Sequence, residues 1–411
     1  MARDRAYANG KHLRSSPSAP LGAVRAARLR RVTSDLQRDP FGFSLTSGGP
    51  WYRAMIRYHL TNPVVRVWWL TVIAWSPLAL AAAVRALAGQ PIDRAVFDLS
   101  VHVRLLVAIP MMLLGELLID AQCRGALGVL YTGELVDREA LQRAATRAEE
   151  LRDSPIAEGV LLLIALAGGQ LVMFGAFGVF HGGGTPSAWT FARLWYGCIA
   201  SPAFQFVTFR WLWHWMIWTY VLVRIARLPL QAIATHPDGA CGIGSLAWPI
   251  TGFASFIFAM GSVLSAAWET QILADRMSVR SLLPAILAFL VIAVSLGCGP
   301  VLLFTSHLYR MRRRTLASYT QLATSYVKQF DAKWIGGGTD ELLGTSDLQS
   351  LADLGNSFGV IVRTRMTLFT PRNVIDLVLA ALVPLIPLAL SFVTVEEILK
   401  RIVGALLGGP I

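Results

Sequence analysis

The sequence predicts an all-α, polytopic integral membrane protein: a bundle of about seven transmembrane helices with kinked spans, joined to short cytoplasmic helices. Two observations predict this fold class. Of the 411 residues, 55% are hydrophobic and only 15% are charged, a balance that is rare in soluble globular proteins. The Arg and Lys residues gather at the ends of long apolar runs, which is the pattern of the positive-inside rule.

The first region, residues 1–66, is rich in Arg and Lys and contains Ser, Pro and Gly throughout. It lacks an early apolar segment of the signal-peptide type. This composition predicts a basic, partly disordered cytoplasmic region as far as about Pro50. Aromatic and basic residues then alternate from Trp51 to Arg66, which predicts an interfacial helix.

Seven apolar runs follow, each a candidate for crossing the bilayer. They are residues 67–87, 104–119, 156–180, 194–223, 246–268, 282–305 and 374–395. The second run is the shortest and most polar. The first six make up a membrane domain, residues 67–305. The last run, with Pro384 and Pro387 inside it, reads as a broken helix and forms residues 373–411 with a C-terminal interfacial helix.

Two charged segments between the runs are predicted to be cytoplasmic helices. Residues 134–152 contain neither Gly nor Pro. Residues 306–372 contain two amphipathic helices whose apolar faces recur every three or four residues. These faces consist of Tyr319, Leu322, Tyr326 and Phe330 on the first helix, and Leu348, Leu351, Leu354 and Phe358 on the second. Such faces need a cover, either within the chain or in a homo-oligomer, and the oligomer is favoured.

The charge distribution also predicts orientation and location. With a cytoplasmic N-terminus, most of the 37 Arg and Lys residues fall on the cytoplasmic side, as in a bacterial cytoplasmic (inner) membrane protein. Membrane lipid is therefore the expected partner of the basic segments. Nucleic acid is not expected, because no motif combines basic and aromatic residues in the manner of a DNA- or RNA-binding protein.

The fourth run contains an arginine, Arg210, with His214 one helical turn further on. An isolated arginine at the bilayer centre costs about 2.5 to 3.5 kcal/mol on insertion scales, so we expect Arg210 to have a partner. The second run offers Glu116 and Asp120, one turn apart on the same helical face. Three interpretations of this group remain: a register-fixing ion pair, a path for ions or protons, and acids that only reach a cytoplasmic cavity.

The loop from Thr235 to Gly244, THPDGACGIG, is a second candidate site. Its Pro-Asp-Gly sequence is typical of a tight turn, which is the favoured interpretation. Gly239 and Gly242 offer backbone N–H groups to an anion, and His236 with Asp238 is a candidate acid–base pair. A nucleotide-binding loop is not favoured, because no strand precedes the glycines.

Three stretches resemble a group of uncharacterised bacterial inner-membrane proteins. They are FRWLWHW (Phe209–Trp215), the HPDGACGIG loop, and LGTSDLQSLADLGNSF (Leu343–Phe358). The resemblance covers most of the chain from the second run onward. It implies a membrane location and no activity, so no functional residue is carried over from it.

The sequence favours a transporter or channel for a small ion or solute, because it has charged residues inside apolar runs and no motif of a known membrane enzyme. Two alternatives stay open. One is a membrane-embedded enzyme that uses the His236/Asp238 loop, and the other is a non-catalytic signalling or scaffold protein that works through residues 306–372. The four cysteines are scattered, which predicts no metal site, and no cofactor is expected.

Overall fold

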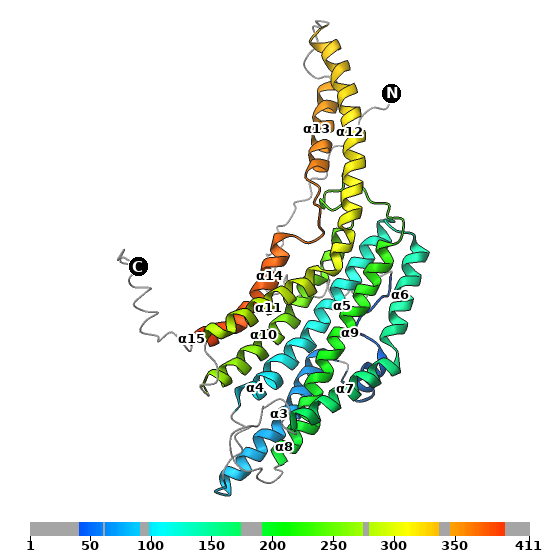
Figure 1. The fold of residues 1–411 in the computed structure, drawn as a ribbon. Coiled ribbons are helices and arrows are strands. Elements are labelled where there is room, and N and C mark those ends of the chain that lie inside the picture. Colours follow the sequence, from blue (N-terminus) through cyan, green and yellow to red (C-terminus); the bar gives the residue numbers. More distant parts are fainter. Residues whose placement is uncertain are drawn as a thin grey trace, which may run out of the picture. The chain divides into compact units, whose positions relative to one another are not determined.

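The computed structural model describes residues 41–60, 62–90, 98–173, 191–273, 279–336 and 346–390. All of them belong to one compact unit, Phe41–Ile411, and within them the regular secondary structure is helical (Figure 1). Three sequence predictions lie outside the described residues: the disorder of residues 1–40, the end of the third apolar run beyond Met173, and the C-terminal interfacial helix.

Five described helices are long and apolar enough to cross a membrane, judged by length and composition. They are α3 (Pro63–Leu87), the continuous helix α4–η2–α5 (Leu99–His102, Val103–Ala108 and Ile109–Thr132), η4–α10 (Gly244–Ala247 and Pro249–Leu273), α11 (Val279–Cys298), and α14–η6–α15 (Pro371–Leu382, Val383–Leu385 and Ile386–Leu390). They coincide with five of the seven predicted runs and indicate a membrane protein.

The other two predicted runs form helices that are not among these five. Helix α7 (Pro155–Met173) is a shorter apolar helix in the described residues. The fourth run forms α8 (Phe191–Trp195), η3 (Tyr196–Ala200) and α9 (Ser201–Ala226). Its Arg, His, Gln and Trp residues make it less apolar than its length alone suggests. Seven crossings therefore remain a prediction.

The second predicted run is longer than the sequence indicates. We expected the shortest span, residues 104–119, whereas the helix continues from Leu99 to Thr132. Asp98 begins it by accepting a 2.9 Å hydrogen bond from the N–H of Ser100. Beyond residue 119, the sequence turns polar with Asp120, Gln122 and Arg124, but Asp120 and Arg124 pair with each other one turn apart (2.5 Å). The helix therefore continues through a stretch that looks like its end.

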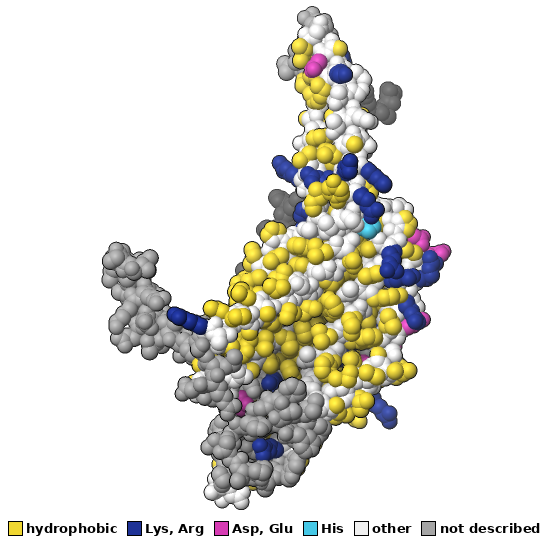
Figure 2. All heavy atoms as spheres, viewed as in Figure 1, with side chains coloured by type: hydrophobic (Ala, Val, Ile, Leu, Met, Phe, Trp, Pro, Cys, Tyr) yellow, Lys and Arg dark blue, Asp and Glu magenta, His cyan; other side chains and the backbone are white. Residues whose placement is uncertain are grey.

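The buried centre of the bundle lies where α5, α9 and α10 pack together. Trp211 of α9 stacks on Phe256 of α10, with 5.5 Å between ring centroids, and its indole N–H donates to the carbonyl of Met112 (3.0 Å). Gly115 allows this approach, because a Cβ there would lie 2.0 Å from Oγ of Ser255. The outer faces of α3, α7 and α11 instead expose Leu, Val and Ile side chains, which contribute to the apolar surface in Figure 2.

Helices outside the apolar bundle are charged. Helix α6 (Arg138–Arg152), expected within residues 134–152, is N-capped by Asp137 and packs on α9. Helices α12 (Thr305–Trp334) and α13 (Ser346–Val362) contact each other as a hairpin. The first turns of α12 carry an Arg cluster, and α14 starts with Thr370 as N-cap and Pro371 as its first residue.

Candidate functional site

The ionisable residues predicted for the fourth and second runs meet in the interior, together with one acid that the sequence analysis did not single out. Glu116 and Asp120 come from α5, Arg210 and His214 from α9, and the additional acid, Glu158, from the first turn of α7. Each is buried, and Arg210 is only 2% exposed. We call these five residues the charged cluster.

Arg210 is paired with two carboxylates and one backbone carbonyl. Its Nη1 donates to Oε1 of Glu158 (3.2 Å), and its Nη2 donates to the carbonyl oxygen of Thr46 (3.2 Å). Its Nε lies 3.4 Å from Oε1 of Glu116, an ion pair without hydrogen-bond geometry. A buried guanidinium needs countercharges of this kind, because leaving it unpaired in the interior would be costly.

The structure therefore contains the expected ion pair with Glu116, but Asp120 has other partners and Glu158 was missed. Glu158 stands at the edge of the third apolar run, where the sequence gives no reason to distinguish it from a surface acid. Only the packing of α7 on α9 brings it to Arg210. His214 is buried one turn beyond Arg210, as its spacing predicts.

Asp120 and its neighbours hold a non-helical segment of the N-terminal region, residues 43–48, which we call the strap. Oδ1 of Asp120 accepts three hydrogen bonds, from the N–H of Leu45 (2.7 Å), the N–H of Thr46 (3.0 Å) and the hydroxyl of Ser44 (2.7 Å). Arg152 donates to the carbonyl of Ser44. Acids thus bind the N–H groups of the strap, while Arg152 and Arg210 bind its carbonyl groups.

Helix α2 (Gly49–Arg57) follows the strap and is anchored to the same cluster. Oε2 of Glu158 accepts the N–H of Trp51 in its first turn (2.7 Å), where a carboxylate also stabilises the helix dipole. The side chains of Phe43 and Leu45 are fully buried. We expected disorder as far as about Pro50, but from Phe41 onward this region is packed, because the cluster supplies partners for its backbone.

The charged cluster lies where α9 reaches the charged helix α6. Glu158 is in the first turn of α7, and Arg210 is about 28 Å along the helix from Phe191 at 1.5 Å per residue, close to the roughly 30 Å hydrocarbon thickness. Past Arg210, α9 runs beside the charged helix α6. The second half of the fourth run therefore packs against a polar helix.

The loop around Asp238 is a closed turn. Oδ1 of Asp238 accepts the N–H groups of Ala240 (2.8 Å) and Gly242 (3.0 Å), and Oδ2 accepts that of Gly244 (3.0 Å). Burial raises the pKa of this carboxyl, but the three backbone donors and His236 outweigh burial and hold the pKa below its ordinary value. Gly239 and Gly242 adopt φ of +64° and +89°, which favour glycine.

These contacts bear on two interpretations of the loop: anion binding by the N–H groups of Gly239 and Gly242, and acid–base chemistry by His236 and Asp238. The N–H of Gly242 is directed to Asp238 and that of Gly239 to the carbonyl of His236 (3.2 Å), so neither is presented to an external anion. The predicted pair is present, with Nδ1 of His236 2.9 Å from Oδ1 of Asp238 and the His236 side chain 40% exposed. Asp238 is nevertheless committed to the turn, which supports a structural role.

Among the described residues, no group of three or more His, Cys, Asp or Glu side chains is arranged to hold a metal ion. The comparisons with protein-family models, curated proteins and solved structures found no match to this chain. The functional argument therefore rests on the geometry described above.

Proposed function

We propose that this chain is a multi-pass protein of a bacterial cytoplasmic membrane. In this topology α7 and α8–α9 cross beside the five long apolar helices, and the N-terminus is cytoplasmic. Support comes from the charge asymmetry, because most Arg and Lys residues then lie on the cytoplasmic side. The Arg cluster at the start of α12, which follows α11 after the short helix η5 (Pro300–Phe304), agrees with this orientation (Figure 2).

Within this membrane we infer a non-catalytic scaffold role, carried by the α12–α13 hairpin. The observation that supports it is the incomplete burial of the apolar faces of the hairpin, in which Leu322 and Leu348 are exposed and the other six face residues are only partly buried. Leu308 is the buried residue of the 30-residue α12, and Ile361 is that of α13. Leu322 is 53% exposed and Leu348 is 40% exposed. Water-exposed apolar faces of this kind favour association.

A second copy of the chain is the cover that we propose. Identical hairpins can bury the same apolar residues against each other around a two-fold axis, which is the commonest symmetry of oligomers. The hairpin itself has specific internal contacts that define its surface: the hydroxyl of Tyr326 donates to the carbonyl of Asp347 (3.0 Å), and Lys333 pairs with the carboxylate of Asp347 (2.5 Å).

The experiment is a measurement of oligomeric mass in detergent by light scattering. The double variant Leu322→Ser/Leu348→Ser removes exposed apolar side chains and is expected to shift the protein toward a monomer without lowering its Tm. The matched control is Thr324→Ala, an exposed change on the same helix that should leave the mass unchanged. A monomeric wild type, or an unchanged mass of the double variant, would contradict the proposal.

Transport is the second candidate, and the strap is the observation that favours it. A non-helical segment covers buried ionisable groups and is held by hydrogen bonds to its backbone, which makes it a candidate gate. The test is ion or proton flux into vesicles with a variant in which residues 43–48 are replaced by Gly and Ser. Flux in the strap variant but not in the wild type, together with loss of this flux when Arg210→Leu is added, would establish an ion or proton path through the charged cluster. Equal flux in the wild type and the strap variant argues against it.

A further inference from the structure

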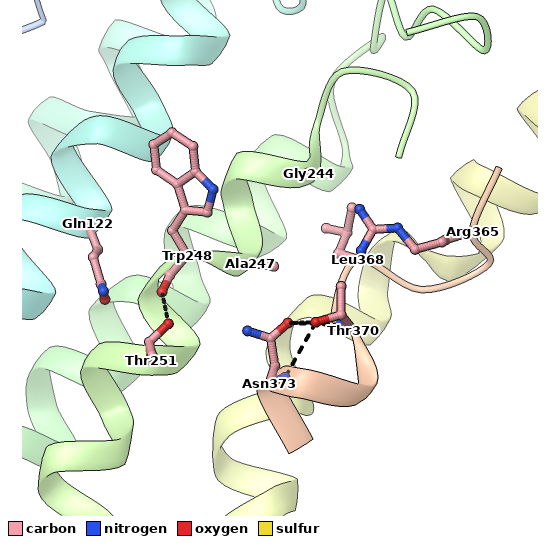
Figure 3. Close-up of a pocket in the computed structure, with 9 residues that line it drawn as sticks. All are labelled: Gln122, Gly244, Ala247, Trp248, Thr251, Arg365, Leu368, Thr370 and Asn373. Atoms are coloured by element: carbon pink, nitrogen blue, oxygen red, sulfur yellow. Dashed lines mark hydrogen bonds between the residues drawn. The ribbon is translucent and has the colours of Figure 1, made fainter. Parts of the chain in front are cut away.

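A pocket of about 410 Å³ lies between α5, the start of α10 and the start of α14 (Figure 3). Its one charged lining residue is Arg365, on the segment that leads to α14. Neutral hydrogen-bonding side chains line it as well: Gln122, Thr251, Thr370 and Asn373. The lining thus has a formal positive charge, several donors and no carboxylate.

The positions of the donors are defined by other contacts. Nη2 of Arg365 donates to the carbonyl of Asp238 (2.7 Å), which holds the side chain in place, and a guanidinium has five N–H donors in total. Oδ1 of Asn373 accepts the N–H (2.8 Å) and the hydroxyl (2.8 Å) of Thr370. The amide nitrogen of Asn373 is therefore turned away from Thr370, as Figure 3 shows.

In the proposed membrane topology, on which this inference rests, the pocket lies at the level of a membrane surface. Helices α10 and α14 both begin there, whereas α5 passes it at Gln122, about 35 Å from Leu99 at 1.5 Å per residue. That distance is close to the roughly 30 Å thickness of the hydrocarbon core. Trp248, at the start of α10, lines the pocket and is 47% exposed, as in the aromatic belts of membrane proteins.

We propose that this pocket binds a phosphate group and that the headgroup of an anionic phospholipid supplies it. Arginine is well suited to phosphate, because its planar fork donates two parallel hydrogen bonds to two oxygens. The positive ends of α10 and α14 add to the attraction. The volume lies in the range of small-ligand sites, about 300 to 1,000 Å³, and the phosphates of a bilayer lie at this depth.

The experiment measures lipid binding by the full-length protein in a neutral detergent. Phosphatidylglycerol, phosphatidylcholine and inorganic phosphate are added separately, and binding is followed by native mass spectrometry and by the change in Tm. Arg365→Gln removes the cation. Thr251→Phe keeps Arg365 but fills the pocket. The control is Arg363→Gln, which removes an exposed arginine two residues away that does not line the pocket.

Phosphatidylglycerol is expected to bind the wild type and Arg363→Gln and to raise the Tm of both. Affinity should fall about ten-fold or more in Arg365→Gln, the usual effect of losing a hydrogen bond to a charged group, and also in Thr251→Phe. If Arg365→Gln does not fold, Thr251→Phe decides the result.

Equal binding to Arg365→Gln and Arg363→Gln would overturn the proposal, since it would reflect only the basic surface. Equal binding of phosphatidylcholine and phosphatidylglycerol would overturn the requirement for an anionic lipid. A Tm increase with inorganic phosphate alone, lost in Arg365→Gln, would support the phosphate site and overturn the lipid as its source.

Discussion

The guanidinium of Arg210 donates to the carboxylate of Glu158 across 3.2 Å, although 52 positions separate the two residues in the chain. This contact joins α9 to the first turn of α7, and the same arginine donates to the carbonyl of Thr46 in the strap. One side chain thus connects two helices and the N-terminal region. Four predictions about this cluster and the Asp238 loop follow from contacts of this kind, and a fifth, about topology, follows from the distribution of Arg and Lys.

Arg210→Leu should destabilise the protein by about 3 to 5 kcal/mol, because it leaves buried carboxylates without their cation. Adding Glu158→Gln should restore part of this loss, since the buried negative charge is then removed as well. The measurement is a double-mutant cycle on thermal unfolding in detergent. Glu150→Gln, in an exposed ion pair with Arg147, is the control and should be additive with Arg210→Leu. Additivity with Glu158→Gln would falsify the assigned pairing.

Asp120→Asn should release the strap, because the amide is a weaker acceptor for the three donors that now converge on one carboxylate oxygen. The readout is maleimide labelling of Leu45→Cys in a background without the native cysteines. Labelling should be slow alone and several-fold faster with Asp120→Asn. Ser47→Cys, an exposed position in the same strap, should label at one rate in both backgrounds. Fast labelling of Leu45→Cys alone would show that the strap is not held.

Asp238→Ala should destabilise the loop by about 1 to 3 kcal/mol, because buried N–H groups lose their acceptor. Burial raises the pKa of Cys241 to about 11, with Asp238 contributing, so the wild-type thiol should resist alkylation at pH 8. A cysteine introduced at Thr324, an exposed position of α12, provides the internal reference. Faster alkylation of Cys241 in Asp238→Ala, with an unchanged rate at position 324, is the expected result. Equal alkylation rates of Cys241 in the two proteins would contradict it.

The same carboxyl predicts a pH dependence. Its folded pKa lies below the ordinary 3.8, so its contribution to stability is complete above that value and is lost as pH falls through the folded pKa. The difference in Tm between wild type and Asp238→Ala should therefore be constant near neutral pH and should narrow below about pH 4. A difference that is independent of pH down to 2.5 would show that the charge of Asp238 does not matter.

The proposed topology places His236, Lys328 and Arg147 on the cytoplasmic side. Cysteines introduced singly at these positions should react with an impermeant maleimide in inverted vesicles and not in intact cells. His236 is partly exposed and Lys328 is exposed, so burial would not explain a failure to label these positions. Labelling of position 236 or 328 in intact cells would contradict the proposed topology.

Local patterns were sufficient for much of the fold. Long apolar runs predicted the five long apolar helices, because the bilayer selects for length and composition that can be read residue by residue. The start of α14 was predictable for the same reason, since Thr370, Pro371 and Asn373 form a local capping motif. Helix α6 is likewise predictable from its own residues, because its apolar residues recur at helical spacing and it contains neither Gly nor Pro.

The second run shows where local patterns fail. Its polar residues look like the end of a helix until their partners are known, and those partners include Ser44, Leu45 and Thr46, more than seventy positions away. Residues 41–48 similarly have the composition of a disordered segment. They are nevertheless ordered, because the charged cluster provides donors and acceptors for their backbone. In both places a distant contact outweighs local preference, because a buried polar group must find a partner.

The sequence by itself determined the helical class, the apolar character of the long helices and the need of Arg210 for a countercharge, since each follows from the cost of placing polar groups in hydrocarbon. Tertiary structure alone decided that Glu158 shares this role with Glu116, that Asp120 binds the strap, and that Arg365 faces a pocket between three helices. These choices depend on which helices pack side by side. Packing is a property of surfaces brought together from distant parts of the chain, so no local pattern records it.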